Sequence, residues 1–434
     1  MFTYVRLKNF LSLGDIVFDF RKKRNPKSVR DVKQFIVIYG ENGSGKSNLA
    51  DSFAFLIASS YAFNYPDRDK EKNWSDMYSM YRTAECSDVT EAEYGILAEG
   101  KEMRYKIKFT NRLIEEELRI ENDISDTPVF RISSGCDGSI NREFRSDIFT
   151  EDNARSFIMD EIDKHWGTYT FISLLYHFIS KKPFSIDDVN IPDDLLFFAG
   201  HLARSCVSLR TRHGDVRLCK QNKYLLEDLV NGTVEHVDIP VLKNTERIIN
   251  SFLMQAYSEV RRAFYVTRPE KNNNVMYELH IDRIVADRLC RMSFTHESEG
   301  VHNSIELLRS IVHALNGELS VCDGIDCGIH DLLLEAMLLS AKDKLEEMSS
   351  QAEKKGQEFT GQLIFTTHST QLLNTLDPSD VYLIKSDYRG QKESVCLSSF
   401  MLRKRDDIRL KYINGLFDGV PIADSIDYTF AIEQ

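Results

Sequence analysis

The sequence contains no run of 18 apolar residues, so we expect no membrane span and no permease fused into the same chain. We expect no signal peptide, and the eight cysteines are scattered without a CxxC pair. This spacing excludes a disulfide framework and a zinc site, and we expect a reduced cytoplasmic protein. No heptad pattern runs long enough for a coiled-coil arm, which excludes a long-armed chromosome-organising protein.

An excess of positive charge is also absent, because the net charge is −12. An acidic chain does not bind nucleic acid with its whole surface, although a local basic patch can still do so. Two basic stretches, 21–33 and 204–223, leave binding to DNA or RNA open. A solvated loop is the simpler interpretation of the first, and the second lacks aromatic residues that stack on bases. The acidic run EEEL at 115–118 indicates a solvated strand or turn rather than a metal cluster.

Apolar residues make up 42% of the 434 positions and include 26 Phe and 18 Tyr, which is enough for a sizeable core. Hydrophobic periodicity predicts an α/β fold, with strands and helices following one another near both ends of the chain. The expected strands lie at about 2–20 (a pair broken at Gly14), 34–40, 90–120 (including a hairpin with a glycine turn), 258–284, 319–323, 362–368 and 381–387. The expected helices lie at about 46–60, 303–315 and 331–353.

Because the α/β pattern occurs at both ends, we expect one core that an insertion interrupts. The predicted parts are an N-terminal part of the core at 1–124, a mostly helical insertion at 125–295, and a C-terminal part of the core at 296–434. Motifs that lie far apart in the sequence should therefore meet in space.

A glycine-rich motif, GENGSGKS at 40–47, fits the pattern G-x-x-x-x-G-K-[ST] and stands between a buried strand and a helix. Glycines let successive backbone N–H groups point at phosphate oxygens, and the helix N-terminus adds its positive end. Lys46 supplies a charge for the β- and γ-phosphates, and Ser47 supplies a hydroxyl for Mg²⁺. The predicted nucleotide-binding residues in this region are Gly40, Glu41, Asn42, Gly43, Ser44, Gly45, Lys46, Ser47 and Asn48.

Asp323 ends the apolar stretch LSVC, which predicts an acidic residue at the end of a buried strand. An acid in this position of a P-loop protein holds Mg²⁺, so Ser47 and Asp323 form the predicted metal site, and ATP with Mg²⁺ are the predicted cofactors. The strand that ends in His368 supports this assignment. The residue after Asp323 is Gly324, where a nucleotide hydrolase is expected to carry a glutamate.

Four segments resemble, in order, the motifs of an ABC-type ATPase head: GENGSGKS, HESEGVHNSIELL (296–308), LSVCDGIDCGIH (319–330) and IFTTHSTQLL (364–373). The resemblance is closest to RecF-like and OLD-like ATP-binding proteins, including the AbiLi type of bacterial abortive-infection systems. The opening LKNFLSLGD and the ending at 381–421 resemble the same group. The resemblance implies the fold of an ABC-ATPase head, with a mixed sheet core, an antiparallel β subdomain and a mostly helical insertion.

The resemblance also implies roles for single residues. Ser298, Glu299 and Gly300 match the signature motif, which in this family reaches across a dimer to the γ-phosphate that the other subunit binds. Asp326 matches the D-loop aspartate and His368 matches the switch histidine, so these two are the predicted catalytic residues. The implied partner is a second copy in an ATP-sandwich homodimer, alone or within a larger assembly. No glutamine is assigned to the loop that usually touches Mg²⁺.

Gly324 is the main departure from the family pattern. In this family a glutamate follows the strand-end aspartate and polarises the attacking water, a contribution of ~10²–10⁴ in rate. Glycine has no side chain for this task, whereas binding uses Lys46, Ser47 and Asp323. We therefore expect ATP binding and ATP-driven dimerisation with slow hydrolysis.

Three functions fit this pattern. The first is an ATP-dependent regulatory or sensor subunit of a bacterial anti-phage (abortive-infection) system, which controls a separate effector protein such as a nuclease or toxin. The second is a RecF-like DNA-binding repair ATPase, and the third is a scaffold that uses ATP structurally. The first function is implied by the resemblance alone. Only about 65 residues follow His368 and they match the ATPase ending, so no effector nuclease is expected in this chain.

Overall fold

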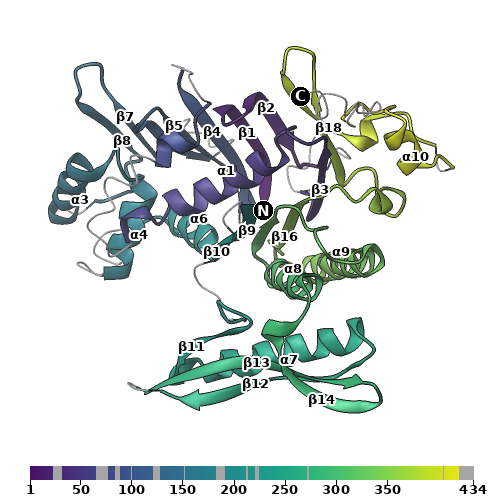
Figure 1. Cartoon of the computed structure of the whole chain (residues 1–434). Coiled ribbons are helices and arrows are strands. Elements are labelled where there is room, and N and C mark those ends of the chain that lie inside the picture. Colours follow the sequence, from purple (N-terminus) through teal and green to yellow (C-terminus); the bar gives the residue numbers. More distant parts are fainter. Residues whose placement is uncertain are drawn as a thin grey trace, which may run out of the picture.

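In the residues that it describes, the computed structural model of the chain contains three β-sheets, with helices packed on and between them (Figure 1). The structure describes residues 1–22, 32–64, 77–83, 88–98, 100–120, 128–150, 152–181, 191–211, 214–219, 224–270, 273–403 and 405–419. Most of the basic stretch 21–33 and part of the stretch 204–223 lie outside these residues.

The core sheet has seven strands in the order β10-β9-β15-β16-β3-β17-β18. Its strands are β3 (Phe35–Gly40), β9 (Cys206–Thr211), β10 (Gly214–Cys219), β15 (Leu319–Cys322), β16 (Gln362–Thr366), β17 (Val381–Ser386) and β18 (Lys392–Cys396). The five inner strands run parallel, and the two edge strands pair antiparallel to them. An inner parallel strand is covered on both faces, which explains why every residue of β3 is buried. Segments from both ends of the chain thus meet in one sheet, as expected.

The two faces of the core sheet carry different helices. Ile36 of β3 belongs to the buried cluster that contains α1 (Lys46–Ser59). The next residue, Val37, packs with α8 (Glu299–Leu315) and α9 (Asp331–Lys354). Because successive side chains of a strand point to opposite faces, α1 and α8 cover opposite sides of the core sheet.

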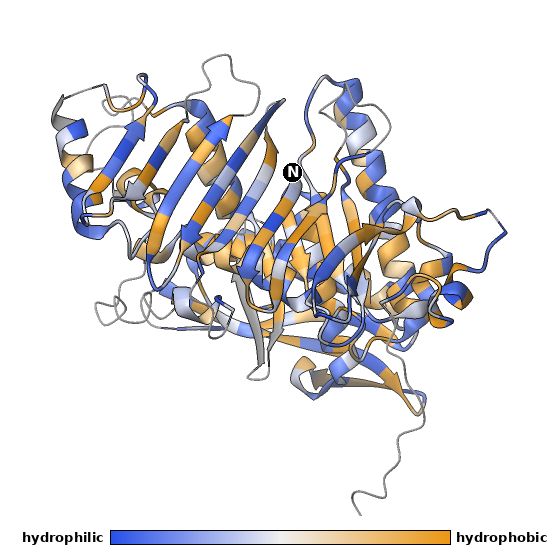
Figure 2. Cartoon of the chain, turned by 90° about the horizontal axis from the view of Figure 1, so that it is seen from above, coloured by the Kyte–Doolittle hydropathy of each residue, from blue (hydrophilic) through white to orange (hydrophobic). Residues whose placement is uncertain are grey.

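A second seven-stranded sheet is antiparallel throughout, in the order β2-β1-β4-β5-β6-β7-β8. Its strands are β1 (Phe2–Phe10), β2 (Leu13–Asp19), β4 (Thr90–Ala98), β5 (Lys101–Phe109), β6 (Leu113–Ile120), β7 (Phe130–Ser134) and β8 (Ile140–Phe144). Polar and apolar residues alternate along these strands (Figure 2), as expected for a sheet with one face on the core. Its buried face shares a cluster with α1, so α1 lies between two sheets and most of its residues are buried.

The first hairpin turns at Leu11 and Ser12, and the expected break at Gly14 is wrong. Phe10 pairs with Leu13, so the loop has two residues, and Leu11 has a φ of 51°. Two-residue hairpin loops need positive φ to match the strand twist, and here a leucine takes that conformation. Gly14 lies inside β2.

A small lobe, formed by α7 and β11 to β14, lies below the core (Figure 1). Its elements are β11 (Asn231–Glu235), α7 (Ile239–Ala256), β12 (Val260–Pro269), β13 (Asn274–Val285) and β14 (Arg288–Ser293). The buried cluster of the lobe includes Val301 and Ile305 of α8. The first half of α8 therefore packs on the small lobe as well as on the core sheet.

The segment 125–295 differs from the expected mostly helical insertion. It contains strands β7 to β14 as well as helices α3 (Asp152–His165), α4 (Phe171–Lys181), α6 (Asp193–Arg204) and α7. β7 and β8 extend the antiparallel sheet, and β9 and β10 extend the core sheet. Strands β7 to β10 have only five or six residues each and contain several polar ones, so their local pattern is weak and pairing with distant strands fixes them. The domain boundaries at 124 and 295 stay a prediction.

The acidic run at 115–118 lies in β6, and the expectation of a solvated run is wrong. Glu116 is fully buried, and Glu115 and Glu117 form ion pairs with Lys106 at 3.2 and 2.9 Å. Within the described residues, no group of three or more His, Cys, Asp or Glu side chains could hold a metal ion.

Candidate functional site

The Lys46 side chain folds back over the glycine-rich loop that follows β3. Its ammonium donates hydrogen bonds to the carbonyl oxygens of Gly40 at 2.8 Å and Glu41 at 2.9 Å. The loop then runs into the first turn of α1, where unpaired backbone N–H groups and the helix dipole favour an anion. The lysine charge and the helix N-terminus therefore meet at one place.

The glycines of this loop are fixed by backbone geometry and by close packing. Gly43 and Gly45 have φ of 83° and 100°, a region that favours glycine. A Cβ on Gly45 would lie 2.5 Å from Leu13 Cδ2, so the first residue of β2 packs directly on the loop. The Ser44 hydroxyl is buried and has no hydrogen-bond partner in the described part of the chain.

Asp323 is held by a residue that sequence reasoning missed. The Thr366 hydroxyl, at the end of β16, donates to Asp323 Oδ1 at 2.5 Å and accepts from the Gly324 N–H at 2.8 Å. Gly324 has a φ of 62°, which favours glycine. The chain thus turns sharply after Asp323, and this turn needs the residue that departs from the expected pattern.

Lys46, Asp323, Asp326 and His368 influence one another electrostatically. Burial lowers the pKa of Lys46 to about 8, and the nearby carboxylates of Asp323 and Asp326 oppose this shift. The pKa of His368 is lowered by burial and by Lys46, against the effect of the same carboxylates. Asp326 also accepts a hydrogen bond from the His368 backbone N–H at 3.0 Å. The structure therefore brings these four predicted residues together.

Asp51 is a second residue that sequence reasoning missed. It lies four residues after Ser47 on α1, so the two side chains share a helix face. Burial and, to a smaller extent, the charge of Asp323 raise the pKa of Asp51 to about 6. In the sequence, the position of Asp51 four residues after Ser47 was the signal that could have pointed to it.

Ser298 and Gly300 lie at the start of α8. Ser298 is the N-cap residue, and its side chain makes no capping hydrogen bond to the helix. A Cβ on Gly300 would lie 2.1 Å from the Gly328 carbonyl oxygen, and Asn303 Nδ2 donates to the Cys327 carbonyl at 2.9 Å. The first turns of α8 and the loop after β15 are therefore packed into one unit.

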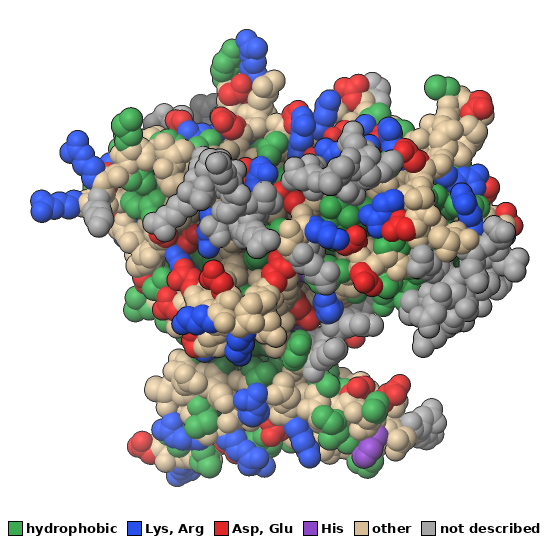
Figure 3. All heavy atoms as spheres, turned by 180° about the vertical axis from the view of Figure 1, so that it is seen from behind, with side chains coloured by type: hydrophobic (Ala, Val, Ile, Leu, Met, Phe, Trp, Pro, Cys, Tyr) green, Lys and Arg blue, Asp and Glu red, His purple; other side chains and the backbone are tan. Residues whose placement is uncertain are grey.

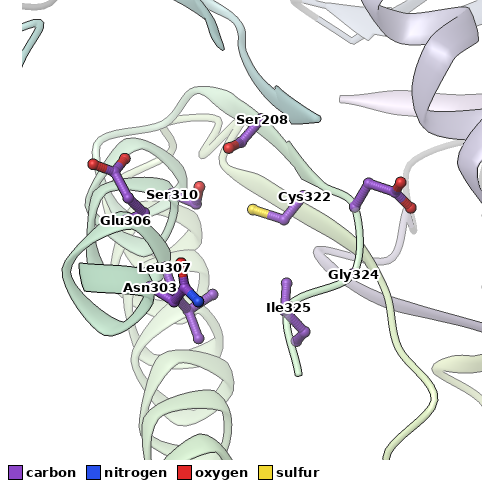
Figure 4. Close-up of a pocket in the computed structure, with 9 residues that line it drawn as sticks. Ser208, Asn303, Glu306, Leu307, Ser310, Cys322, Gly324 and Ile325 are labelled. Carbon is purple, nitrogen blue, oxygen red and sulfur yellow. The ribbon is translucent and has the colours of Figure 1, made fainter. Parts of the chain in front are cut away.

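A cavity of about 30 Å³ lies between α8 and the end of β15 (Figure 4). Its lining residues are Ser208, Asn303, Glu306, Leu307, Ser310, Cys322, Asp323, Gly324 and Ile325. A space of this size is comparable to the volume of one water molecule and is too small for a nucleotide. Glu306 in its wall is paired with Arg309 Nε at 3.1 Å.

The lysine-bearing glycine loop before a helix and the acidic residue at a neighbouring strand end define a P-loop nucleotide-binding domain. A model of the AAA domain family matches residues 4–360, and the chain belongs to this family of ATPases. No curated protein matches the chain. In the part of the chain that the structure describes, no helix is long and apolar enough to cross a membrane.

The predicted site residues all fall within the described part of the chain. They are Gly40, Glu41, Asn42, Gly43, Ser44, Gly45, Lys46, Ser47, Asn48, Ser298, Glu299, Gly300, Asp323, Asp326 and His368. Gly40 ends β3, and those from 41 to 48 lie on the loop and α1. Ser298 is the N-cap of α8, and Glu299 and Gly300 lie in its first turn, across the core sheet from α1. Their individual roles stay predictions.

Proposed function

We propose that this chain binds ATP with Mg²⁺ at the glycine-rich loop and uses the bound nucleotide to pair two copies. One observation carries the proposal: Lys46, Asp323, Asp326 and His368 converge at the carboxyl ends of neighbouring parallel strands. Open α/β sheets bind ligands at this edge.

The residues present fit the phosphates of a nucleotide. The loop offers the Ser44 hydroxyl, which is buried without a partner among the described residues. Gly40 and Gly45 leave no room for a side chain, because a Cβ would lie 2.5 Å from Ser44 Oγ and 2.5 Å from Leu13 Cδ2, respectively. The Lys46 ammonium can exchange its loop carbonyl partners for phosphate oxygens. Ser47 and Asp323 would hold Mg²⁺, with Asp51 beside them, and the ion would supply charge neutralisation.

Equilibrium binding of ATP to the wild type and Lys46→Ala tests this proposal. We expect the variant to lose about 100-fold in affinity, because a charge-assisted contact to phosphate disappears. Lys385→Met is the control. Lys385 lies on β17, the strand next to β3, and its ammonium pairs with Asp418 at 3.3 Å. Equal affinity of the wild type and Lys46→Ala would overturn the proposal.

The position of Ser298 supports the proposed pairing of two copies. α1 and α8 cover opposite faces of the core sheet. On the face that α1 covers, the loop therefore does not meet Ser298 of its own chain. A second copy related by a twofold axis would present its Ser298 to that loop. The unpaired N–H groups at the start of α8 would then face phosphate.

Slow hydrolysis is the expected consequence of Gly324. We expect a wild-type ATP turnover below about 1 s⁻¹. Gly324→Glu should raise this turnover, whereas Gly324→Gln, whose side chain has the shape of glutamate without its charge, should not. Both variants should lose about 1–2 kcal/mol of stability, because the φ of 62° strains any side chain at this position. Steady-state phosphate release measures the turnover, and a wild-type value typical of ordinary ATPases would contradict the expectation.

We further propose that the pair acts as a regulatory subunit of an anti-phage system and controls a separate effector. The support is that a long-lived ATP-bound pair suits a switch better than a motor, together with the resemblance of the motifs. The test is a phage challenge of cells that express the chain with its neighbouring genes. Protection that is lost in Lys46→Ala supports the role, and protection without ATP binding contradicts it.

A RecF-like DNA-binding function is the alternative, and one surface favours it. The small lobe exposes arginines on β12 and β14. They are Arg261, Arg262, Arg268, Arg288 and Arg291. Blue lysine or arginine side chains are visible along the outer edge of this lobe in Figure 3. Fluorescence anisotropy with duplex DNA at two salt concentrations separates the functions, because phosphate contacts make the affinity fall steeply with salt.

A further inference from the structure

Lys392, at the start of β18, lies against the glycine-rich loop although it is 349 residues from Gly43 in the chain. Its ammonium donates hydrogen bonds to the Gly43 carbonyl oxygen at 2.8 Å and to Ser12 Oγ at 2.7 Å. Asn48 Nδ2, in the first turn of α1, also donates to Ser12 Oγ at 2.7 Å. Side chains from three separate elements therefore form one polar cluster beside the loop.

The cluster lies on the side of the loop that is opposite to Asp323. In the core sheet β3 stands between β16 and β17. Asp323 and its partner Thr366 follow strands on the β16 side, whereas Lys392 comes from β18 on the other side. If Asp323 holds the metal at the γ-phosphate end, the rest of the nucleotide extends toward β17 and β18. Lys392 then lies at the α-phosphate and ribose half.

The charge of Lys392 has neutral partners. Among the described residues, no carboxylate lies within ion-pair distance of its ammonium, and its hydrogen-bond acceptors are a carbonyl and a hydroxyl. Burial lowers the pKa of Lys392, and only the more distant charge of Glu41 opposes this. A partly buried cation without a counter-ion favours an anionic ligand.

The hairpin that carries Lys392 has a defined geometry. Asp387 Oδ1 accepts hydrogen bonds from the backbone N–H groups of Arg389 and Gln391, both at 2.8 Å. Gly390 supplies the positive φ of 77° that the turn needs. The lysine is therefore presented to the loop by an ordered turn.

We propose that Lys392 is a second phosphate-binding lysine, which contacts the α-phosphate of ATP or ADP while Lys46 contacts the β- and γ-phosphates. The proposal rests on the proposed nucleotide-binding function and adds a residue from the C-terminal strand to its site. Since ATP and ADP both contain the α-phosphate, the loss of Lys392 weakens both to the same extent.

The experiment is isothermal titration of the full chain with Mg-ATP and with Mg-ADP. Lys392→Met should weaken both ligands by the same factor, about 10-fold, and Lys392→Arg should stay within about threefold of the wild type. Lys385→Met is the matched control on the neighbouring strand and should bind both ligands like the wild type. Lys392→Gln, a neutral hydrogen-bond donor, should resemble Lys392→Met.

Three results would overturn the proposal: wild-type affinity in Lys392→Met, a loss for ATP without a loss for ADP, or restoration by Lys392→Gln. The last result would mean that Lys392 only braces the loop. If the wild type binds no ATP, the proposed function itself fails. A different pattern separates the two proposals. If the wild type and Lys392→Met both bind ATP with wild-type affinity while Lys46→Ala does not bind it, only the inference about Lys392 fails.

Discussion

A single glycine sets both the backbone and the chemistry at the end of β15. Gly324 turns the chain with a φ of 62°, and its N–H donates to the same Thr366 hydroxyl that holds Asp323. A glutamate at this position would therefore strain the backbone as well as add a carboxylate. The missing carboxylate could be predicted from the sequence, but the left-handed turn and the Thr366 contact could not, because both depend on a neighbouring strand.

Glu116 is a buried carboxylate that joins β6 to the start of α4. It accepts hydrogen bonds from the Tyr105 hydroxyl at 2.9 Å, Trp166 Nε1 at 3.0 Å and the Phe171 N–H at 2.6 Å. Burial raises its pKa to about 7, although these donors act in the opposite direction. The folded chain therefore holds a proton on Glu116 more tightly than the unfolded chain does.

This raised pKa predicts how stability changes with pH. The contribution of Glu116 is fully present below its unfolded pKa of 4.5 and is lost as the pH rises through the folded value of about 7. Glu116→Gln carries no titrating proton. Between pH 4.5 and 8 the free energy of unfolding of the wild type should therefore fall, relative to Glu116→Gln, by about 3 kcal/mol. Urea unfolding across this range measures the difference, and a constant difference would contradict the expectation.

At the scale of elements, α8 and the loop after β15 behave as one packed unit. Gly300 permits this, because a Cβ there would lie 2.1 Å from the Gly328 carbonyl oxygen. The same helix contributes Val301 and Ile305 to the core of the small lobe. A shift at the start of α8 therefore reaches both the loop after Asp323 and the small lobe.

Gly300→Ala tests this packing. The added methyl group must push α8 away from Gly328, so we expect a loss of about 1–3 kcal/mol in stability and a weaker ATP-dependent pairing. Gly200→Ala in α6 is the matched control, because a Cβ there meets nothing within 4 Å. It should be neutral or stabilise the chain by up to about 1 kcal/mol, since alanine is the better helix former. Thermal unfolding compares the two, and equal Tm values would rule out the packing argument.

The elements that could be predicted from the sequence are those whose signals are local. The loop at 40–47 and α1 carry their glycines, lysine and helical spacing within one short stretch. β9 and the contact of Lys392 with Gly43 carry no such signal, because strand pairing and a separation of 349 residues create them. Sequence reasoning therefore located the phosphate loop and the motif residues Asp323, Asp326 and His368, but not Thr366 or Lys392.

At the scale of the whole molecule, the proposed dimer makes each nucleotide site depend on two chains. One subunit would provide Lys46 and the other would provide Ser298, which lies across the core sheet from α1 in its own chain. Lys46→Ala damages the first half of a site, and Ser298→Arg damages the second half with a bulky side chain. Each variant alone should therefore show no ATP-dependent pairing.

A mixture of the two variants should recover part of the pairing. In a mixed dimer one site combines both damaged halves, whereas the other combines the intact loop of Ser298→Arg with the intact Ser298 of Lys46→Ala. Light scattering with ATP should therefore detect dimers in the mixture but not in either variant alone. If both halves of a site came from the same chain, each subunit of the mixture would remain defective and no dimer would form. Recovery thus distinguishes a shared site from a self-contained one without any measurement of hydrolysis, which Gly324 is expected to keep slow.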